Sequence, residues 1–372
     1  MNLHVLPSNR GISRTDIEWA DYAVGSPFRF RDKGTGQVYP TACVKVSDGC
    51  KNCYAESIGK RFGTYLPFTK PNMDRLECFL DQGVIDHVLS FKPRPPKGEA
   101  TFKNGRSRPA VFFGDTTDIF GEWVTFEQLD ALFACFALRP DVDFLLLTKR
   151  PERMAEYLDR PWVTMADGRT GLRDGINAAA FDLTVGRHVF PTQAHGMIDG
   201  PSWPLPNVWL GCSVENQTTA DVRIPHLLKC PAAVRFLSVE PLLGAVDLKL
   251  RKAWSDGNVP YGHAVGRGAG DLHWIIVGGE SGHDARPSDV ERGRSVVRQC
   301  ADAGVLCFMK QLGAWPLCGC GGDLAAYAKN HGFKRVSCAS CNAVYPLRNR
   351  KGSDPSEWPA DLRVRQVPGG AA

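Results

Sequence analysis

Short apolar runs alternate with amphipathic stretches from about residue 110 onward. The runs, rich in β-branched and aromatic residues, cover residues 111–113, 144–147, 208–210, 234–237, 274–277 and 305–309. Continuous apolar runs of this length are typical of strands that are buried on both faces, as in parallel sheets. Residues 127–137, 220–228 and 290–303 have the spacing of the helices that would connect such strands. The alternation predicts an α/β fold, either a barrel or an open sheet.

Polar residues follow these runs, where each predicted strand would end. In barrels and in open parallel sheets, this carboxyl edge carries the ligand site. Two of the ends are near copies, Ser-Val-Glu at 213–215 and again at 238–240. Glu215, Glu240 and Glu280 would therefore share one rim, and they are the candidates for catalytic carboxylates.

The composition is that of an ordinary soluble globular protein, with 43% hydrophobic and 23% charged residues among 372. No apolar run reaches the length of a membrane span, and the first residues lack the apolar core of a signal peptide. We therefore expect a cytoplasmic protein without a membrane partner. Thirteen cysteines in such a chain argue against a disulfide framework.

Three of these cysteines form a C-x6-C-x2-C pattern at Cys43, Cys50 and Cys53, before a predicted helix at 54–61. Three thiolates can hold three irons of a cubane cluster and leave the fourth iron open to another ligand. Structural zinc normally takes four ligands, and this loop offers no fourth cysteine or histidine. A C-x-x-C redox pair leaves Cys43 unexplained, and three ordinary buried cysteines do not suit a polar loop. The loop therefore favours an iron–sulfur cluster.

The chain resembles the phage-associated three-Cys-motif family, whose members look like radical S-adenosylmethionine (SAM) enzymes. The resemblance spans residues 16 to about 315. It rests on Ile-Glu-Trp at 17–19, also a candidate first strand, and on the cysteine loop at 43–56. It continues with Leu-Thr-Lys-Arg-Pro-Glu-Arg at 147–153, Trp-Leu-Gly-Cys-Ser-Val-Glu-Asn at 209–216, the stretch 235–244, Val-Gly-Gly-Glu-Ser-Gly at 277–282 and Lys-Gln at 310–311. Residues 23–40 and the cysteines beyond 317 depart from the family pattern.

The resemblance implies a partial (β/α) TIM-like barrel with a [4Fe–4S] cluster on Cys43, Cys50 and Cys53. It further implies that SAM is cleaved reductively to a 5′-deoxyadenosyl radical, with electrons from a donor such as flavodoxin or ferredoxin. The candidate contacts to SAM are strand-end residues, namely Asp115, Thr116, Asp118, Lys149, Glu215 and Asn216. The simpler alternative for Lys149 is a salt-bridged rim, and for the glycine-rich stretch 278–282 it is a plain strand-to-helix turn.

A second cysteine group, Cys318, Cys320, Cys338 and Cys341, has the form C-x-C-x17-C-x2-C. Two close pairs with a short spacer are a zinc-ribbon signature. A second iron–sulfur cluster is the main alternative, and absence of metal is another. We predict a barrel over 1–316 with insertions near 23–40 and 161–206, a metal-binding insertion at 317–345 and a tail at 346–372.

The formal charge of +5 is mild, but residues 92–108 hold six cations against the single acid Glu99. Such a patch suits DNA or RNA, although solvated loops explain it equally well. We therefore predict a radical SAM enzyme that modifies or repairs a nucleic-acid base or nucleotide. The alternatives are a non-catalytic zinc protein that binds nucleic acid and a radical enzyme for a small metabolite or peptide.

Overall fold

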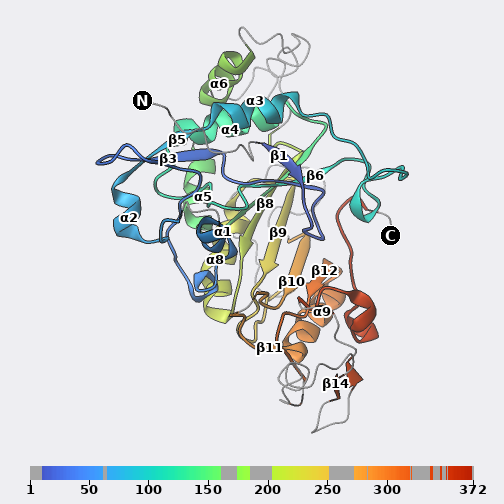
Figure 1. Cartoon of the computed structure of the whole chain (residues 1–372). Helices are drawn as coiled ribbons and strands as arrows, with labels where there is room; N and C mark the ends of the chain where they lie inside the picture. The colour runs from blue at the N-terminus through green and yellow to red at the C-terminus, as the bar shows by residue number, and fades with distance from the viewer. Residues whose placement is uncertain are drawn as a thin grey trace.

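One curled sheet of eight strands forms the centre of the molecule (Figure 1). The computed structural model describes residues 11–61, 65–160, 174–184, 203–250, 272–282, 284–318, 320, 336–337, 344–345, 349 and 351–370. In spatial order the strands are β1 (Ile12–Arg14), β2 (Tyr22–Val24), β6 (Ala110–Phe113), β7 (Asp143–Thr148), β8 (Val208–Ser213), β9 (Val234–Val239), β10 (Trp274–Gly278) and β12 (Leu306–Gln311). Only β1 runs antiparallel to its neighbour; the other pairs are parallel. The protein is thus a mixed α/β protein with a mostly parallel half-barrel.

Eight α-helices and three small sheets accompany this half-barrel in the described residues. The helices are α1 (Tyr54–Arg61), α2 (Lys70–Asp74), α3 (Gln82–Ser90), α4 (Phe126–Ala137), α5 (Pro151–Leu158), α6 (Asp174–Thr184), α8 (Gln217–Lys229) and α9 (Val290–Ala303). The small sheets pair β3 (Phe28–Asp32) with β4 (Val38–Tyr39) and β5 (Leu76–Leu80), β11 (Ser288–Asp289) with β13 (Pro316–Leu317), and β14 (Val336–Ser337) with β15 (Val344–Tyr345). None of the described helices combines the length and the apolarity needed to cross a membrane.

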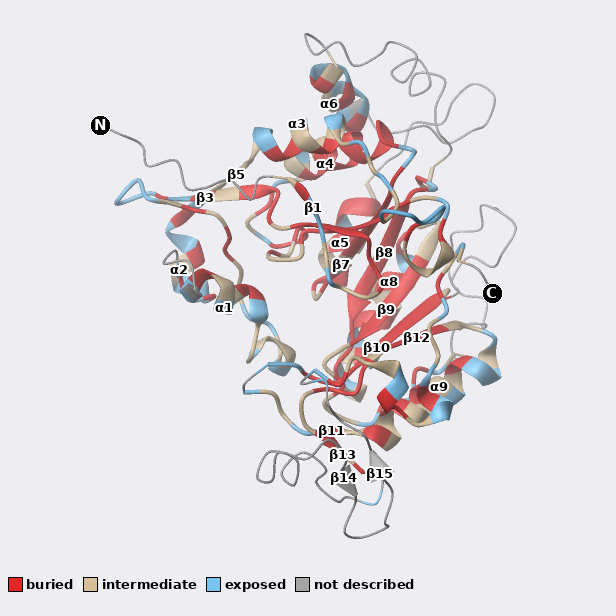
Figure 2. Cartoon of the chain, turned by 45° about the vertical axis from the view of Figure 1, so that its right-hand side comes forward, coloured by how far each residue is buried: buried red, intermediate tan, exposed pale blue. Residues whose placement is uncertain are grey.

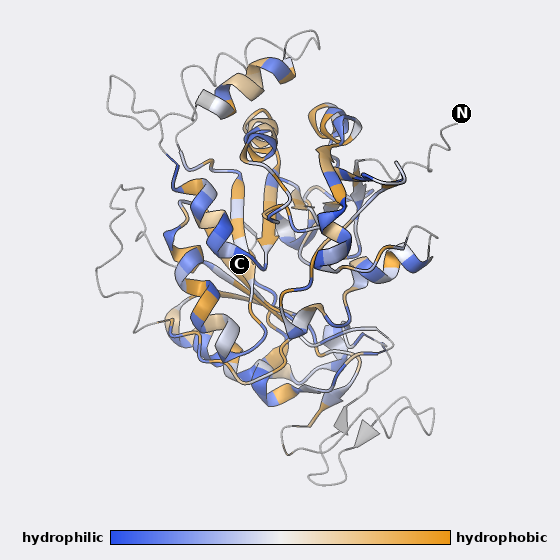
Figure 3. Ribbon diagram, turned by 90° about the vertical axis from the view of Figure 1, so that its left-hand side faces the viewer, coloured by the Kyte–Doolittle hydropathy of each residue, from blue (hydrophilic) through white to orange (hydrophobic). Residues whose placement is uncertain are grey.

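The sheet is buried on both faces, and alternate side chains serve two separate cores (Figure 2). On the outer face, Phe113 of β6 packs 4.9 Å from Phe136 of α4. On the inner face, Phe112 packs 4.8 Å from Trp19, and Trp274 lies among further aromatic rings. The parallel strands are therefore mostly apolar, whereas the helices carry hydrophilic residues on their outer sides (Figure 3). This burial explains the continuous apolar runs of the sequence.

The six strands predicted from apolar runs are confirmed as β6, β7, β8, β9, β10 and β12, and the three connecting helices as α4, α8 and α9. The helix predicted after the cysteine loop is confirmed as α1. The helix α4 starts at a capping box, in which Thr125 accepts from the main-chain N–H of Gln128 and the Gln128 side chain accepts in return. Such caps stabilise a helix by about 1 kcal/mol.

The predicted first strand at residues 17–19 is wrong. The first parallel strand is β2, and residues 17–19 belong to the turn between β1 and β2. The ammonium group of Lys103 holds this turn, because it donates to the main-chain oxygens of Thr15, Ile17 and Ala20 at 2.6, 3.0 and 2.9 Å. The predicted insertion at 23–40 contains the end of β2 and the hairpin of β3 and β4, while the one at 161–206 is described only at α6 and from residue 203.

Candidate functional site

The carboxyl ends of the parallel strands form one edge, and the predicted polar residues lie along it. They come from β6 (Asp115, Thr116, Asp118), β7 (Lys149), β8 (Glu215), β9 (Glu240) and β10 (Glu280). The loop with Cys43, Cys50 and Cys53 contacts this same edge, as the following hydrogen bonds show. The structure therefore brings together segments that are far apart in the sequence.

The first part of the cysteine loop is fixed by the ends of β6 and β7. Thr117 donates from Oγ1 to the main-chain oxygen of Ala42 at 2.8 Å, and Arg150 donates from Nη2 to that of Val44 at 2.9 Å. Asp118 orients this arginine through an ion pair of 3.1 Å. Its other oxygen accepts from the hydroxyl of Thr148 at 2.7 Å. Asp118, a predicted SAM contact, thus positions the arginine that holds the loop.

The middle of the loop packs on Glu215, whose exposed fraction is only 1%. Ser47 donates to Oε1 of Glu215 at 2.8 Å, and Lys149 lies 3.4 Å from the same atom. Arg223 of α8 pairs with Oε2 at 3.2 Å. Gly49 approaches so closely that a Cβ atom there would meet Oε1 of Glu215 at 2.4 Å. Glu215 therefore anchors the loop between Cys43 and Cys50, and Lys149 supports it.

The end of the loop reaches β10 and β6. Asn52 donates to Oε2 of Glu280 at 3.2 Å, and Arg286 forms a bidentate pair with the same carboxylate at 2.7 and 2.9 Å. Burial opposes ionisation of this carboxyl, but the bonds from Arg286 hold the pKa of Glu280 below its ordinary value. The hydroxyl of Tyr54 donates to the main-chain oxygen of Asp115. The loop is thus attached to four different strand ends.

The three thiols are free, half-buried and close enough to affect one another electrostatically. Burial raises the pKa of Cys43 to about 12; the nearby Asp118 adds to the rise, and Arg150 opposes it. Burial also raises the pKa of Cys53, and a charge on Cys50 raises it further. Without a metal, Cys43 and Cys53 are therefore protonated at neutral pH.

Main-chain N–H donors lie near two of these sulfur atoms, those of Cys43 and Cys53. Cys53 directly precedes α1, and the N–H groups of Ala55 and Glu56 lower the pKa of its thiol. The N–H group of Asp118 does the same for Cys43. Donors at a helix N-terminus favour a thiolate over a thiol. These donors suit an anionic sulfur ligand, such as one bound to iron.

Among the described residues, no three His, Cys, Asp or Glu side chains are arranged to hold a metal ion. The donor chemistry of the loop nevertheless fits an iron–sulfur cluster. It offers three sulfur atoms at one edge of the sheet, main-chain N–H groups directed at two of them, and the cations Lys149 and Arg150 nearby. Binding of a cluster would displace the thiol protons and bring the three sulfur atoms closer together.

One carboxylate at this edge has an oxygen atom without a hydrogen-bond partner. In the described part of the chain, Oδ1 of Asp115 is buried and accepts no bond. Burial raises the pKa of Asp115 to about 7, and the hydroxyl of Tyr54 opposes the rise. Such an oxygen is suited to accept from a cationic ligand group, because pairing would offset its desolvation.

The other predicted site residues are Glu240, Asn216 and Thr116, and each has a hydrogen-bond partner. Glu240 pairs with Lys310 at 2.7 Å and accepts from Gln311 at 3.1 Å. Asn216 caps α8 by accepting from the main-chain N–H of Thr219 at 3.0 Å. The main-chain oxygen of Thr116 accepts from the hydroxyl of Thr41, which also ties it to the cysteine loop. Asn216 is thus used in a helix cap, whereas Glu240 extends the polar edge.

Sequence reasoning missed Ser47, Asn52, Arg223 and Arg286, which fix the loop and the carboxylates. Ser47 and Asn52 stand inside the cysteine motif, so their polar side chains were a usable signal. Arg223 and Arg286 lie in ordinary helix and loop sequence, and nothing in the pattern marks them.

The second cysteine group lies largely outside the described residues. Cys338 and Cys341 are not described, Cys318 is buried and Cys320 is exposed. Zinc or a second cluster at these four cysteines stays a prediction.

The fold and the site together define a class of protein, in which an α/β half-barrel carries a three-cysteine loop at the carboxyl edge of its sheet. A family model described as "Protein of unknown function (DUF5131)" matches residues 33–353, and the chain belongs to this family. Comparison with curated proteins gives no match. Comparison with solved structures also gives no match.

Proposed function

We propose that the protein is a radical SAM enzyme whose [4Fe–4S] cluster is held by Cys43, Cys50 and Cys53. The observation that supports this proposal most is the placement of the cysteine loop. Three thiols, too few to close a zinc site, lie where parallel half-barrels bind their ligands. When bound, the cluster would supply the electron that splits a carbon–sulfur bond of SAM and yields a 5′-deoxyadenosyl radical.

The chain's own residues would bind and orient SAM. Asp115 offers the unpartnered oxygen Oδ1, which would accept from the methionyl ammonium group. Lys149 lies 3.4 Å from Oε1 of Glu215, and its ammonium group would also pair with the methionyl carboxylate. The aromatic inner core, with Trp19, Phe112 and Trp274, excludes water from the interior beneath this edge.

The surface of the cysteine loop suits the electron donor that the chemistry requires. Val46 and Tyr54 are 44% and 51% exposed, which is unusual for large apolar side chains. Lys51 and Lys60 are exposed in the same segment, and Lys45 is exposed but paired with Glu56 at 2.7 Å. A segment that exposes apolar side chains together with cations fits an acidic one-electron carrier, such as a flavodoxin or a ferredoxin.

A nucleic-acid substrate receives less support than the radical chemistry. Within the basic segment at 92–108, Lys103 holds a main-chain turn, Arg106 is buried and Arg108 pairs with Asp143. The exposed cations that remain are Lys92, Arg94 and Lys97. Modification or repair of a base or nucleotide therefore rests on the sequence, and salt-dependent binding of DNA and RNA tests it.

The proposed activity is tested by anaerobic reconstitution with iron and sulfide, reduction with dithionite and addition of SAM. The proposal predicts a cubane-type absorption spectrum and formation of 5′-deoxyadenosine. A protein that binds zinc at the loop, takes up no cluster and cleaves no SAM would overturn it. Substitution of Asp115 by Asn should weaken SAM binding while the cluster content stays unchanged.

A further inference from the structure

An enclosed arginine lies at the opposite end of the half-barrel, near the amino ends of the strands. Arg106 follows the 3-10 helix η2 (Lys103–Gly105) and is only 2% exposed. Its atoms Nε, Nη1 and Nη2 are all buried, and none has a hydrogen-bond partner among the described residues. A guanidinium has five N–H donors, and buried polar groups nearly always find acceptors. Arg106 thus lacks the partners that its burial calls for.

Two tryptophan rings stack on the guanidinium group of Arg106. The guanidinium carbon lies 4.9 Å from the ring centre of Trp209 and 5.6 Å from that of Trp274. Stacking of this kind stabilises a cation, but it leaves the in-plane N–H donors unused. Burial lowers the pKa of Arg106 to about 10, and the charges of Asp21 and Asp143 oppose this decrease. The group therefore stays cationic at neutral pH.

The two nearby carboxylates are already engaged. Asp21 accepts from the main-chain N–H groups of Lys103 and Ala110 at 2.7 and 2.8 Å. Asp143 forms an ion pair with Arg108. Neither carboxylate accepts a hydrogen bond from the guanidinium of Arg106, so the charge of Asp21 offsets that of Arg106 only through space.

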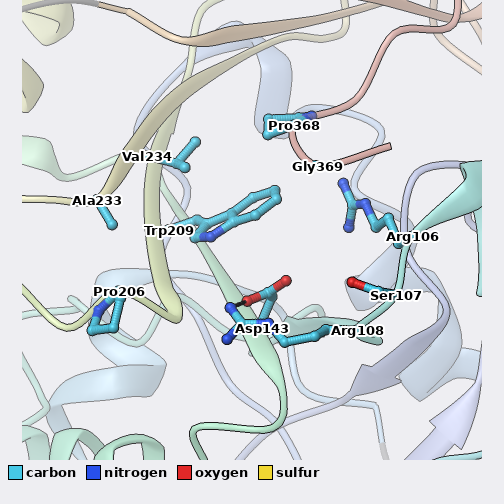
Figure 4. A pocket seen from close by; sticks show the side chains of 10 residues that line it. All are labelled: Arg106, Ser107, Arg108, Asp143, Pro206, Trp209, Ala233, Val234, Pro368 and Gly369. Atoms are coloured by element: carbon cyan, nitrogen blue, oxygen red, sulfur yellow. Dashed lines mark hydrogen bonds and ion pairs between the residues drawn. The ribbon is translucent and has the colours of Figure 1, made fainter. Parts of the chain in front are cut away.

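The charge of Arg106 borders a pocket of about 360 Å³ (Figure 4). Arg106 and the ring of Trp209 face each other in it, and Pro206 and Val234 add apolar surface. The C-terminal tail closes another side with Pro368 and Gly369. The rim residues Ser107, Pro206 and Gly369 are exposed, so a ligand can enter from solvent although the guanidinium is buried.

We propose that this pocket binds a small organic oxyanion, with its charged group on Arg106 and its apolar body against Trp209. A carboxylate or a phosphate monoester presents two oxygen atoms that match the guanidinium fork. One guanidinium without acceptors suits one anionic group, and the volume suits a small molecule. Binding would supply the missing acceptors in a desolvated place, where such bonds are strongest. The pocket lies apart from the cysteine loop, and the proposal does not depend on the radical SAM function.

The test uses the full chain and three probes of similar shape, phenyl phosphate, benzoate and neutral benzamide, in calorimetric titrations at constant ionic strength. We expect saturable binding of at least one of the two anions and none of benzamide. Arg106→Met should weaken binding of the anion at least tenfold, because it removes the charge and keeps most of the length. Arg31→Met on β3 is the matched control, since Arg31 is an exposed arginine paired with Glu77; this variant should bind like the wild type.

A second readout separates binding from folding. Without a ligand, Arg106→Met should melt at the same temperature as the wild type or higher, because it removes a buried cation that has no hydrogen-bond partner. The phenyl phosphate-dependent shift of the arginine Nε–Hε NMR signals in the wild-type protein supports the assignment independently if this variant does not fold. Absence of saturable binding of both anions, equal binding of benzamide, or undiminished binding by a folded Arg106→Met protein would overturn the proposal.

Discussion

Gly49 offers a sharp test of how the cysteine loop is attached to the sheet. In a Gly49→Ala variant, the new Cβ would lie 2.4 Å from Oε1, 2.7 Å from Cδ and 2.8 Å from Cγ of Glu215. Three contacts of this kind cannot be relieved by rotating one terminal group. Glu215 has no free space to retreat into, because it is 1% exposed and is held by Ser47 and Arg223. The substitution must therefore push the loop away or break one of these bonds.

The expected loss of stability follows from these two possibilities. A lost hydrogen bond to a charged group costs about 1.5–3 kcal/mol. Forcing an extra methyl group into a packed site costs about 1–3 kcal/mol. Because displacement of the loop would relieve part of the crowding, the two effects do not add fully. We expect Gly49→Ala to lower the free energy of unfolding by about 3 kcal/mol.

Urea denaturation of the metal-free, reduced protein measures this change. Gly34→Ala is the matched control, because its Cβ would meet nothing closer than Oδ1 of Asp32 at 3.4 Å and neither glycine has a positive φ. That variant should differ from the wild type by about 0.5 kcal/mol or less. Iron uptake during reconstitution should fall in Gly49→Ala only. A Gly49→Ala protein as stable as the Gly34→Ala protein would refute the packing of the loop on Glu215.

Three further predictions concern charge at the same edge. Burial raises the pKa of Asp115 from 3.8 to about 7, so the folded state keeps a proton at pH values where the unfolded state has lost it. The free energy of unfolding should therefore fall by about 3 kcal/mol as the pH rises from 4 to 7, and urea titrations of Asp115→Asn should lack this decline. Lys51→Glu should slow SAM cleavage several-fold with an acidic flavodoxin as the electron donor but leave the rate with dithionite unchanged. Equal slowing with both reductants would contradict binding of the donor at the cysteine loop. Glu280→Gln should weaken the pair with Arg286 and destabilise the protein by about 1–3 kcal/mol in thermal unfolding, and an unchanged melting temperature would mean that this carboxylate does not anchor the loop.

The central sheet could be predicted because each parallel strand is buried on both faces. This burial produces apolar runs that stand out without any tertiary information, as at β7 and β10. The small sheet of β3, β4 and β5 was not found, because β3 alternates charged and buried residues over only five positions. The sequence at 17–19 favours a strand, but the structure has a turn there, because bonds from the distant Lys103 hold it together with bonds inside the turn.

The candidate site was predictable in its residue types and not in its contacts. The cysteines and the strand-end acids were recognised, and their common edge followed from the parallel sheet. The bond from Ser47 to Glu215 joins residues 168 positions apart, and no local pattern indicates it. For the basic segment at 92–108, the residue types do not indicate which side chains are buried. The segment suggested a solvent-exposed surface for a polyanion, yet Lys103 and Arg106 face inward.

The measurement that tests the central claim most directly is the yield of 5′-deoxyadenosine in a series of cysteine variants. Cys43→Ala, Cys50→Ala and Cys53→Ala are compared with the wild type and with Cys78→Ala, which changes a half-buried cysteine of β5 outside the loop. All proteins are reconstituted anaerobically, reduced with dithionite and given SAM. The account predicts that the wild type and Cys78→Ala form 5′-deoxyadenosine and that each of the three loop variants forms none. Product from a loop variant at the wild-type rate, or no product from a wild-type protein that carries a full cluster, would contradict it.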